Sequence, residues 1–499
     1  MLITALLILL QIAFILFLAS YTIRSVYGAY AVFETLSIFC VIFLVNERGN
    51  PSYKISWIIF ILLIPFAGWI FFLIFGGTRV FPYLKRRYKR IESSSEKYRI
   101  QDNNVMLRLE NNGLLGARQA KYLYKESGYP VYGSTETEFF PSGEAVFEAL
   151  LKDLKTARKY IFIEFFIVAE GYMWDKIHKI LLERIADGIE VRLLFDDFGS
   201  ANRQYKSFVK NIRAEGIKVS VFNPIKPSSN IFLNNRNHRK MLVIDGSIAY
   251  TGGFNIADEY INKLERFGHW LDCGIRLRGD AVKSFTVMFC DMWRFTSFKS
   301  KINAADYICS DELAVIGDGF VQPYCDGPFD DRFAAEGIYL QLINSARKYI
   351  YIATPYLIID NTMSDALLRA AKSGVDVRII CPSHPDKWYV HPVTQYHYAF
   401  LMEAGIKIYE YTPGFIHSKL FAVDDRFATV GTVNMDYRSF FFHFECGVWL
   451  CGTSSVGSIK NNLENTMNNS RLIDPALWAK RPLKMRIKQF ILHLFAPFM

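Results

Sequence analysis

Residues 237–255 read NHRKMLVIDGSIAYTGGFN, and residues 416–434 read IHSKLFAVDDRFATVGTVN. Both stretches follow one pattern: His-x-Lys, four residues, Asp, six residues, then Gly-Gly or Gly-Thr, one residue and Asn. One copy of so short a pattern can arise by chance. Two copies with the same tail at the same offset indicate that a structural unit is duplicated in this chain.

The duplication extends well beyond these two stretches. ARKYIFI at 157–163 recurs as ARKYIYI at 346–352, and other segments recur at a similar separation. Each half alternates helical segments with short apolar strands, a pattern typical of α/β folds. The first half has about ten additional residues before its histidine, in a Pro-, Ser- and Asn-rich stretch at 224–237 that predicts a loop. We therefore expect an α/β fold with two pseudo-symmetric lobes.

Each copy carries a histidine and a lysine two positions apart. In a strand such residues project from the same face, so His238 would lie beside Lys240, and His417 beside Lys419. An imidazole next to an ammonium group packs poorly but suits phosphate chemistry, because the lysine can neutralise a phosphate oxygen. Two histidines, one from each half, could attack a phosphodiester on one side and protonate its leaving group on the other.

The other polar residues of the pattern have different expected roles. The amides of Asn255 and Asn434 can donate hydrogen bonds to the bound phosphate. Asp245 and Asp424 belong to the motif, but because they close their strands we expect them to fix local structure rather than contact substrate. The candidate catalytic set comprises His238, Lys240, Asp245, His417, Lys419 and Asp424.

Both motifs and the wider repeat resemble the phospholipase D superfamily over roughly residues 135–480. That resemblance implies two α/β lobes with one active site at their interface. A closer resemblance, to bacterial cardiolipin synthases, is carried by GGFNIADEY at 252–260, NMDYRSF at 434–440, NSARKYIYIATPY at 344–356 and the apolar segments ahead of them. It implies a phosphatidyl transfer between two phosphatidylglycerol molecules that yields cardiolipin and glycerol.

The resemblance also implies two chemical steps through a phosphohistidine. We assign His238 as the nucleophile and His417 as the general acid and base, although the near-symmetry of the halves leaves the reverse open. A nucleophilic imidazole needs an acceptor for its other N–H group. Asp272 and Glu445 occupy equivalent places after the two motifs. We expect Asp272 to orient His238 and Glu445 to orient His417.

One short segment departs from the pattern of the family. Where the resemblance implies Glu-Leu-Asn, this chain has Phe441, Phe442 and His443. His443 is two residues from Glu445, so we expect it to lie close to that carboxylate and to alter the shape of the second-half pocket.

Three alternative functions use related residues. A phospholipase D-type hydrolase or another phosphatidyltransferase would pass through the same covalent intermediate, so the two histidines do not distinguish them. A nuclease can use the same dyad, but apolar N-terminal segments argue against it. A non-catalytic lipid-binding protein would not need intact motifs in both halves.

The first 78 residues are strongly apolar. Segments at about 2–23, 28–45 and 55–76 are nearly uncharged, apart from Glu34 in the second, and about 20 such residues can cross a bilayer. The first segment lacks a basic start and has too long an apolar core for a signal peptide. We therefore expect transmembrane segments within residues 1–78 and a multi-pass location in the cell membrane.

Basic residues follow these segments and recur at the end of the chain. TRVFPYLKRRYKR opens a basic juxtamembrane linker at 79–134, which the positive-inside rule places in the cytoplasm together with the catalytic lobes. The tail at 481–499 has apolar residues at helical spacing with Arg and Lys between them, as expected of a helix on an anionic bilayer or one packed on the protein. The net charge of +10 suits anionic lipids, and the apolar segments favour lipid over nucleic acid.

The remaining expectations concern domains and cofactors. The two phospholipase D-like lobes should cover residues 135–315 and 316–480. The eight cysteines are scattered, and no His/Cys cluster has zinc-site spacing, so we expect neither a metal nor another cofactor. Acyl-chain preference and oligomeric state are open at this point.

Overall fold

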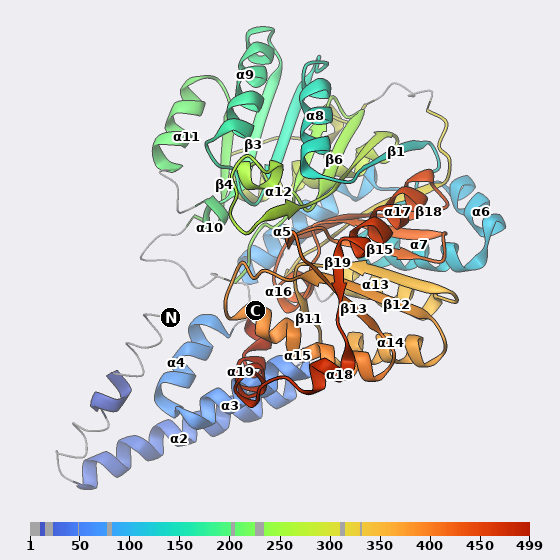
Figure 1. Cartoon of the computed structure of the whole chain (residues 1–499). Coiled ribbons are helices and arrows are strands. Elements are labelled where there is room, and N and C mark those ends of the chain that lie inside the picture. The colour runs from blue at the N-terminus through green and yellow to red at the C-terminus, as the bar shows by residue number, and fades with distance from the viewer. Residues whose placement is uncertain are drawn as a thin grey trace.

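The structure is a computed structural model that describes residues 10–14, 23–47, 49–76, 82–200, 205–224, 234–309, 315–329 and 332–499. Figure 1 shows two α/β lobes, one above the other, with the N-terminal helices at the lower end of the molecule.

Each lobe is built on one large mixed sheet. The first sheet contains β1 (Thr135–Phe140), β2 (Tyr160–Phe165), β3 (Glu190–Asp196), β4 (Lys218–Phe222), β5 (Met241–Ile244), β6 (Ile248–Gly252) and β8 (Gly274–Gly279). The second contains β9 (Phe320–Asp326), β10 (Tyr349–Ala353), β12 (Asp376–Pro382), β13 (Lys407–Tyr411), β15 (Leu420–Val423), β16 (Phe427–Gly431), β18 (Glu445–Cys451) and β19 (Ser470–Leu472).

The two sheets have the same topology. The strand order is β1-β8-β6-β5-β2-β3-β4 in the first lobe and β9-β18-β16-β15-β10-β12-β13 in the second, where β19 adds an edge strand. Three strands in each sheet are parallel, and the remaining pairs are antiparallel. The expected α/β fold with two pseudo-symmetric lobes is therefore confirmed.

Helices connect the parallel strands because such strands need a crossover. In the first lobe these are α9 (Tyr172–Ala186) and α11 (Tyr205–Ala214), and in the second they are α14 (Asn361–Lys372) and α15 (Val390–Glu403). The other long helices of the lobes are α8 (Gly143–Leu154), α12 (Val282–Thr296), α13 (Ala334–Ser345) and α17 (Ser454–Asn468).

Three apolar cores hold the lobes together. The outer cores lie between each sheet and the helices that cover it. The third core joins the lobes, because it combines Phe162 and Met241 of the first sheet with Leu420 and Val448 of the second and Phe285 of α12. Burial of these large side chains at about 1.5–3 kcal/mol each makes the lobes one packed unit rather than two tethered domains.

The basic stretch at 79–134, expected as a linker, contains three helices. These are α5 (Pro82–Ser95), α6 (Asn103–Asn112) and α7 (Leu114–Ser127). α5 packs on α12 of the first lobe, while α7 packs on α13 and β9 of the second. Apolar side chains of α6 and α7 are buried in the outer core of the second lobe: Leu109, Ala117, Ala120 and Leu123. Their helical spacing is difficult to recognise in the sequence because basic and other polar residues stand between them.

The N-terminal segments differ from the three spans that the sequence suggested. The second lies in α2 (Ile23–Asn46), and most of the first lies outside the described residues. The third is divided into α3 (Pro51–Leu63) and α4 (Pro65–Phe75), because proline lacks an N–H group and disfavours helical geometry in the residue before it. Among the described residues, no single helix combines the length and apolar character needed to cross a bilayer.

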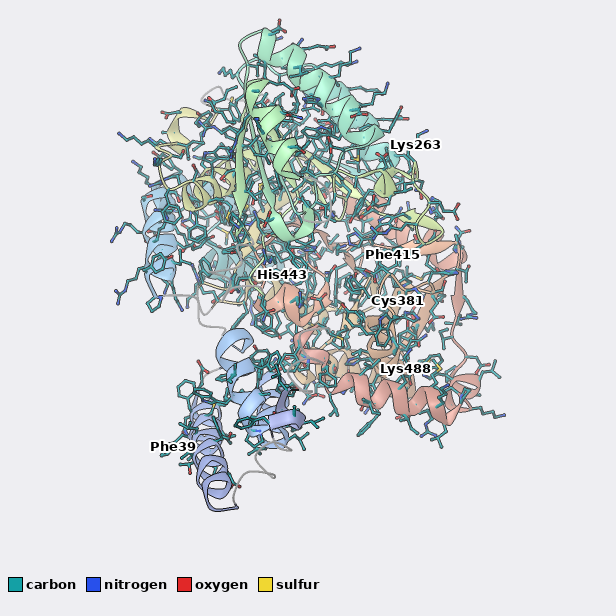
Figure 2. All side chains as sticks on the ribbon, turned by 90° about the vertical axis from the view of Figure 1, so that its left-hand side faces the viewer. Phe39, Lys263, Cys381, Phe415, His443 and Lys488 are labelled. Carbon is teal, nitrogen blue, oxygen red and sulfur yellow. The ribbon has the colours of Figure 1, made fainter. Side chains whose placement is uncertain are left out.

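These N-terminal helices pack against the second lobe and the C-terminus. Trp57 and Ile61 of α3 share a buried cluster with Val393 of α15, with Phe442 and with Ala496. The C-terminal helix α19 (Leu483–His493) packs on α15 beside them. Figure 2 shows Phe39 on α2 and Lys488 on α19 at this same lower end of the molecule.

Short elements complete the structure. They are α10 (Asp197–Ser200), α16 (Tyr437–Phe441), α18 (Pro475–Ala479), β7 (His269–Leu271), β11 (Leu357–Ile358), β14 (Gly414–Ile416), β17 (Met435–Asp436), and the 3₁₀ turns η1 (Glu96–Tyr98), η2 (Asp258–Ile261), η3 (Ala304–Asp306) and η4 (Ala496–Phe498). β7 of the first lobe pairs with β14 of the second in parallel, so a two-stranded sheet crosses the junction between the lobes.

Candidate active site

The two motif histidines come together at the junction between the lobes. His238 lies three residues before the start of β5, and His417 lies three residues before the start of β15. Both side chains are buried. Each histidine is close enough to Lys240 and Lys419 that both ammonium groups lower its pKa. The fold therefore brings the two imidazoles and the two lysines together at one site, as the sequence predicted.

Each histidine is paired with a carboxylate from the opposite lobe. His238 Nδ1 lies 2.9 Å from Glu445 Oε1, and His417 Nδ1 lies 2.7 Å from Asp272 Oδ2. Both carboxylates that the sequence singled out lie against a motif histidine, but each one pairs with the histidine of the other half and not with that of its own half. The pairs cross the junction, so neither lobe contains a complete histidine–carboxylate pair.

Backbone hydrogen bonds explain the crossed pairing. The His417 N–H donates to the Leu271 carbonyl at 2.7 Å, and the His238 N–H donates to the Phe444 carbonyl at 2.9 Å. Leu271 and Phe444 immediately precede the two carboxylate residues, so each histidine is attached beside the acid of the other lobe. This arrangement follows from the strand pairing at the junction, which includes the pairing of β7 with β14, and the spacing of residues in the sequence does not predict it.

The histidines have the protonation state that nucleophilic attack requires. Burial and then the neighbouring lysines hold the pKa values of His238 and His417 well below the usual range, so both rings are neutral near pH 7. A neutral ring that donates its Nδ1 proton to a carboxylate keeps the lone pair on Nε2 free. Burial also raises the pKa of Asp272 to about 7.

The motif lysines are fully buried beside the histidines. Lys240 Nζ donates to the His238 carbonyl at 2.7 Å, and Lys419 Nζ donates to the His417 carbonyl. Burial lowers the pKa of Lys240 to about 7 and that of Lys419 to about 8. A bound phosphodiester would restore both positive charges, because an anion favours the protonated form of a nearby amine.

Asp245 and Asp424 fix the backbone, as expected, and do not contact either motif histidine. Asp245 accepts hydrogen bonds from the backbone N–H groups of Arg158, Lys159 and Tyr160 at 2.7–2.8 Å. Asp424 does the same for the equivalent residues of the second lobe, at 2.7–2.9 Å. Both residues have φ near +54°, a left-handed conformation that Asp tolerates better than most residues.

The two motif asparagines lie in different surroundings. Both ends of the Asn255 amide already form hydrogen bonds: its Oδ1 accepts from the Ile167 N–H at 3.0 Å, and its Nδ2 donates to the Tyr260 hydroxyl at 2.7 Å. Asn434 is also buried, and its Oδ1 has no hydrogen-bond partner among the described residues. Their predicted contact with phosphate stays a prediction, with Asn434 the less constrained of the two.

The first motif has Gly253 where the second has Thr432, and this difference accompanies the difference between Asp272 and Glu445. A Cβ atom at Gly253 would lie 2.1 Å from Asp272 Oδ1, so only glycine leaves room for this carboxylate. The equivalent residue of the second motif is Thr432, whose hydroxyl donates to Glu445 Oε2. This hydrogen bond holds the Glu445 carboxylate in place.

Sequence analysis missed several residues at this site. Lys387 contributes to the lowered pKa of both histidines, and its Nζ donates to the Tyr356 hydroxyl at 2.7 Å. Asp386 accepts from that same hydroxyl at 2.5 Å. These residues lie outside the repeated motif. The one sequence signal for them is the polar segment SHPDKWY, which directly follows a predicted strand.

His443 lies close to Glu445, as its position in the sequence suggested. Its Nδ1 is 3.7 Å from Glu445 Oε1, and its ring centroid is 5.4 Å from that of His238. Figure 2 places His443 at the junction between the upper lobe and the rest of the molecule.

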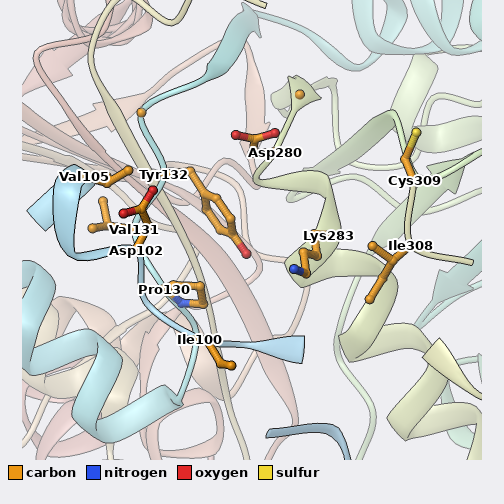
Figure 3. Close-up of a pocket in the computed structure, with 13 residues that line it drawn as sticks. Ile100, Asp102, Val105, Pro130, Val131, Tyr132, Asp280, Lys283, Ile308 and Cys309 are labelled. Carbon is orange, nitrogen blue, oxygen red and sulfur yellow. The ribbon is translucent and has the colours of Figure 1, made fainter. Parts of the chain in front are cut away.

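A separate pocket of about 270 Å³ lies where residues 100–105 and 130–133 meet the first lobe (Figure 3). Tyr132, Asp280 and Lys283 line it. None of the predicted site residues lines it, so this pocket is distinct from the histidine pair.

Comparisons with known proteins identify the families that the chain matches. A family model described as "Cardiolipin synthase, PLD-like domain" matches residues 150–266 and 339–467, and one described as "Phospholipase_D-nuclease N-terminal" matches residues 35–77. The two ranges of the cardiolipin synthase model include His238, His417 and Asn434. The range in the first lobe ends at residue 266, before Asp272.

Relatives align over nearly the whole chain. A cardiolipin synthase of Alkalihalophilus pseudofirmus is 34% identical, with 94% of both chains covered. An uncharacterised protein of Streptococcus mutans is 38% identical over 92% of this chain and 99% of its own. Among solved structures, a phosphatidylserine synthase of Haemophilus influenzae matches with a TM-score of 0.59 at 13% identity, covering 76% of this chain and 97% of its own, which supports the fold.

Proposed function

From the membership of this chain in the cardiolipin synthase family of the phospholipase D superfamily, we propose that it joins two phosphatidylglycerol molecules to give cardiolipin and glycerol. The chain is accordingly a phosphatidyltransferase. The family membership carries the specific reaction. The pair of buried imidazoles, each beside a carboxylate and both next to two buried lysines, supports phosphoryl transfer at this site.

The first step forms a covalent intermediate. His238 Nε2 attacks the phosphorus of one phosphatidylglycerol, and the bond from phosphorus to the glycerol head-group oxygen breaks. His417, protonated when the anionic substrate is bound, gives its proton to the departing glycerol oxygen. Lys240 and Lys419 stabilise the charge that develops on the phosphoryl oxygens.

The second step transfers the phosphatidyl group. A terminal hydroxyl of a second phosphatidylglycerol enters, His417 removes its proton, and the oxygen attacks phosphorus. The phosphorus–nitrogen bond breaks, so His238 is regenerated and cardiolipin leaves. Water in place of the second lipid would give phosphatidic acid, so transfer requires that lipid alcohol outcompete water at this step.

We further propose that the N-terminal helices and α19 hold the protein at the membrane, with the lobes on the cytoplasmic side. Apolar side chains of α2 such as Phe39 and Val45 are exposed, as are Leu483 and Phe490 of α19. The basic residues that follow α4 favour the cytoplasmic side through the positive-inside rule.

Incubation of the purified chain with phosphatidylglycerol alone tests the reaction. We expect cardiolipin and glycerol in equal amounts, and no product from the His238→Ala protein. Phosphatidic acid as the main product would identify a hydrolase instead. Absence of any lipid product, together with cleavage of nucleic acid, would overturn the proposed function.

A further inference from the structure

His443 is a buried polar side chain that the proposed reaction leaves unused. It is about nine-tenths buried, and neither ring nitrogen has a hydrogen-bond partner among the described residues. A buried polar group without a partner costs about 1–3 kcal/mol. Phenylalanines flank it on both sides in the sequence, and Glu445 and His238 are its nearest polar neighbours that carry ligand atoms.

Three ligand groups converge at this point. A nitrogen of His238, a nitrogen of His443 and a carboxylate oxygen of Glu445 all lie within 4.8 Å of one another. Two imidazoles and one carboxylate form a ligand set typical of a zinc site with an open fourth position. Magnesium and calcium prefer all-oxygen sites, so the two nitrogen donors favour a transition metal.

We propose that His238, His443 and Glu445 form an inhibitory binding site for Zn²⁺ that switches the transferase off by occupying its nucleophile. This inference rests on the proposed role of His238 and adds a regulatory ligand that the family resemblance does not imply. It also revises the expectation from sequence that the chain has no metal site.

Coordination through either nitrogen of His238 prevents attack on phosphorus. If Nε2 binds the metal, its lone pair forms the coordinate bond and is no longer available to the substrate. If Nδ1 binds the metal, the ring proton resides on Nε2, which again has no free lone pair. Glu445, drawn into the coordination sphere, also ceases to orient the ring.

The surroundings suit a dication. Neither ring nitrogen of His443 has a hydrogen-bond partner among the described residues, so a metal ion could bind there without breaking a hydrogen bond of that ring. Glu445 supplies a negative charge, and Thr432 holds that carboxylate in place. Lys240, whose Nζ donates to the His238 carbonyl at 2.7 Å, is a nearby positive charge that this ligand set must outweigh.

Calorimetric titration of the full-length, detergent-solubilised, metal-free protein with ZnCl₂ tests the site directly. We expect one strong site per chain in the wild type and at least a tenfold weaker affinity in the His443→Asn protein, since loss even of an outer-shell partner costs about 10–100-fold. His178→Asn is the matched control, because His178 forms a pair with Glu215 on the helical surface, 2.8 Å apart, and lies outside the cluster.

Phosphatidyl transfer is measured in parallel, with each variant compared with its own metal-free rate. Zn²⁺ should inhibit the wild type and His178→Asn proteins equally, a chelator should restore activity, and inhibition of His443→Asn should require at least tenfold more metal. Equal Zn²⁺ affinity in wild type and His443→Asn, or equal inhibition of both, would overturn the site. A metal-free wild type that makes no cardiolipin would instead contradict the proposed function, and calorimetry would still decide the metal site.

Discussion

At the scale of single residues, the two histidines differ in their carboxylate partners. His238 pairs with a glutamate held by Thr432, and His417 pairs with an aspartate that fits against Gly253. The crossed pairs connect each carboxylate with one chemical step. In the mechanism proposed above, Glu445 orients the nucleophile, and Asp272 orients the general acid and base.

Amide substitutions should separate the two steps. Glu445→Gln removes the negative charge and lets an amide N–H face His238 Nδ1, which favours the tautomer with its proton on Nε2. A change of this kind typically reduces kcat by roughly 10²–10⁴-fold. Asp272→Asn should slow glycerol release from phosphatidylglycerol to a similar extent, but should spare release of a nitrophenolate head group, which departs without a proton. Stopped-flow absorbance of nitrophenolate from a phosphatidyl-4-nitrophenol substrate measures this difference.

The reverse result would contradict the assignment of His238 as the nucleophile. If Asp272→Asn abolishes the nitrophenolate burst and Glu445→Gln preserves it, then His417 is the nucleophile. Wild-type rates with both substrates provide the reference.

The lysines predict how activity depends on pH. In the free enzyme the pKa is about 7 for Lys240 and about 8 for Lys419, so both are protonated only at lower pH. We therefore expect kcat/KM to fall as pH rises through about 7–8, and kcat to fall only at higher pH because bound phosphate favours the charged lysines. Steady-state rates on phosphatidylglycerol from pH 5 to pH 10 measure both, and a flat kcat/KM up to pH 9 would refute the assignment.

At the scale of elements, each motif aspartate acts as a clamp between two strands. Asp245 closes β5 and binds the N–H groups at the start of β2, and Asp424 joins β15 to β10 in the same way. The strand that carries each histidine is therefore held in register with its neighbour. The aspartates contribute to the site through the backbone alone.

Loss of one clamp should affect stability more than chemistry. Asp245→Ala removes three charge-assisted hydrogen bonds and places alanine at positive φ, which we expect to lower the free energy of unfolding by about 2–4 kcal/mol. The melting temperature and the transfer rate well below it measure the two effects. Asp425→Ala is the control at positive φ, because Asp425 has φ +57° and its carboxylate binds the side chains of Tyr349 and Lys460, at 3.0 and 2.7 Å, and not backbone N–H groups. Equal destabilisation by both substitutions would show that the backbone hydrogen bonds of Asp245 add no stability.

The exposed face of α19 predicts membrane attachment at the element scale. Ile487 and Phe490 are 50% and 60% exposed on a helix that also carries basic residues. Replacing both with Asp should weaken binding to phosphatidylglycerol vesicles at least tenfold, since burying such side chains contributes about 1.5–3 kcal/mol each. Vesicle sedimentation measures the binding.

Ile316→Asp is the control for this experiment. Ile316 is 94% exposed but lies between the lobes in the sequence, away from α19. If that substitution weakens vesicle binding as much as the α19 change does, the attachment is not localised to the helix.

At the scale of the whole molecule, catalysis depends on the contact between the lobes. The β7–β14 pairing, the inter-sheet core and both histidine–carboxylate pairs all cross that contact. Relative displacement of the lobes would therefore disturb the nucleophile and the acid at once.

Gly414→Ala should report this dependence. A Cβ atom at Gly414 would lie 2.3 Å from the His269 carbonyl oxygen, a backbone atom of the other lobe, so β14 must move away from β7. Because a misplacement of about 1 Å can cost about 10²-fold in rate, we expect kcat to fall at least tenfold. Gly457→Ala in α17 is the control, since its Cβ would meet nothing within 4 Å; unchanged kcat in Gly414→Ala would show that the site tolerates lobe movement.

The sequence by itself determined the α/β class, the two-fold duplication, the two histidine–lysine pairs and the identities of Asp272 and Glu445. These features are local, because strand periodicity and repeated spacing follow from backbone geometry and burial along the chain. It did not determine which carboxylate pairs with which histidine, or that residues 82–134 pack against both lobes. Those outcomes depend on contacts between residues far apart in sequence: the pairing of β7 with β14 and the fit of Asp272 against Gly253 exist only once the lobes meet.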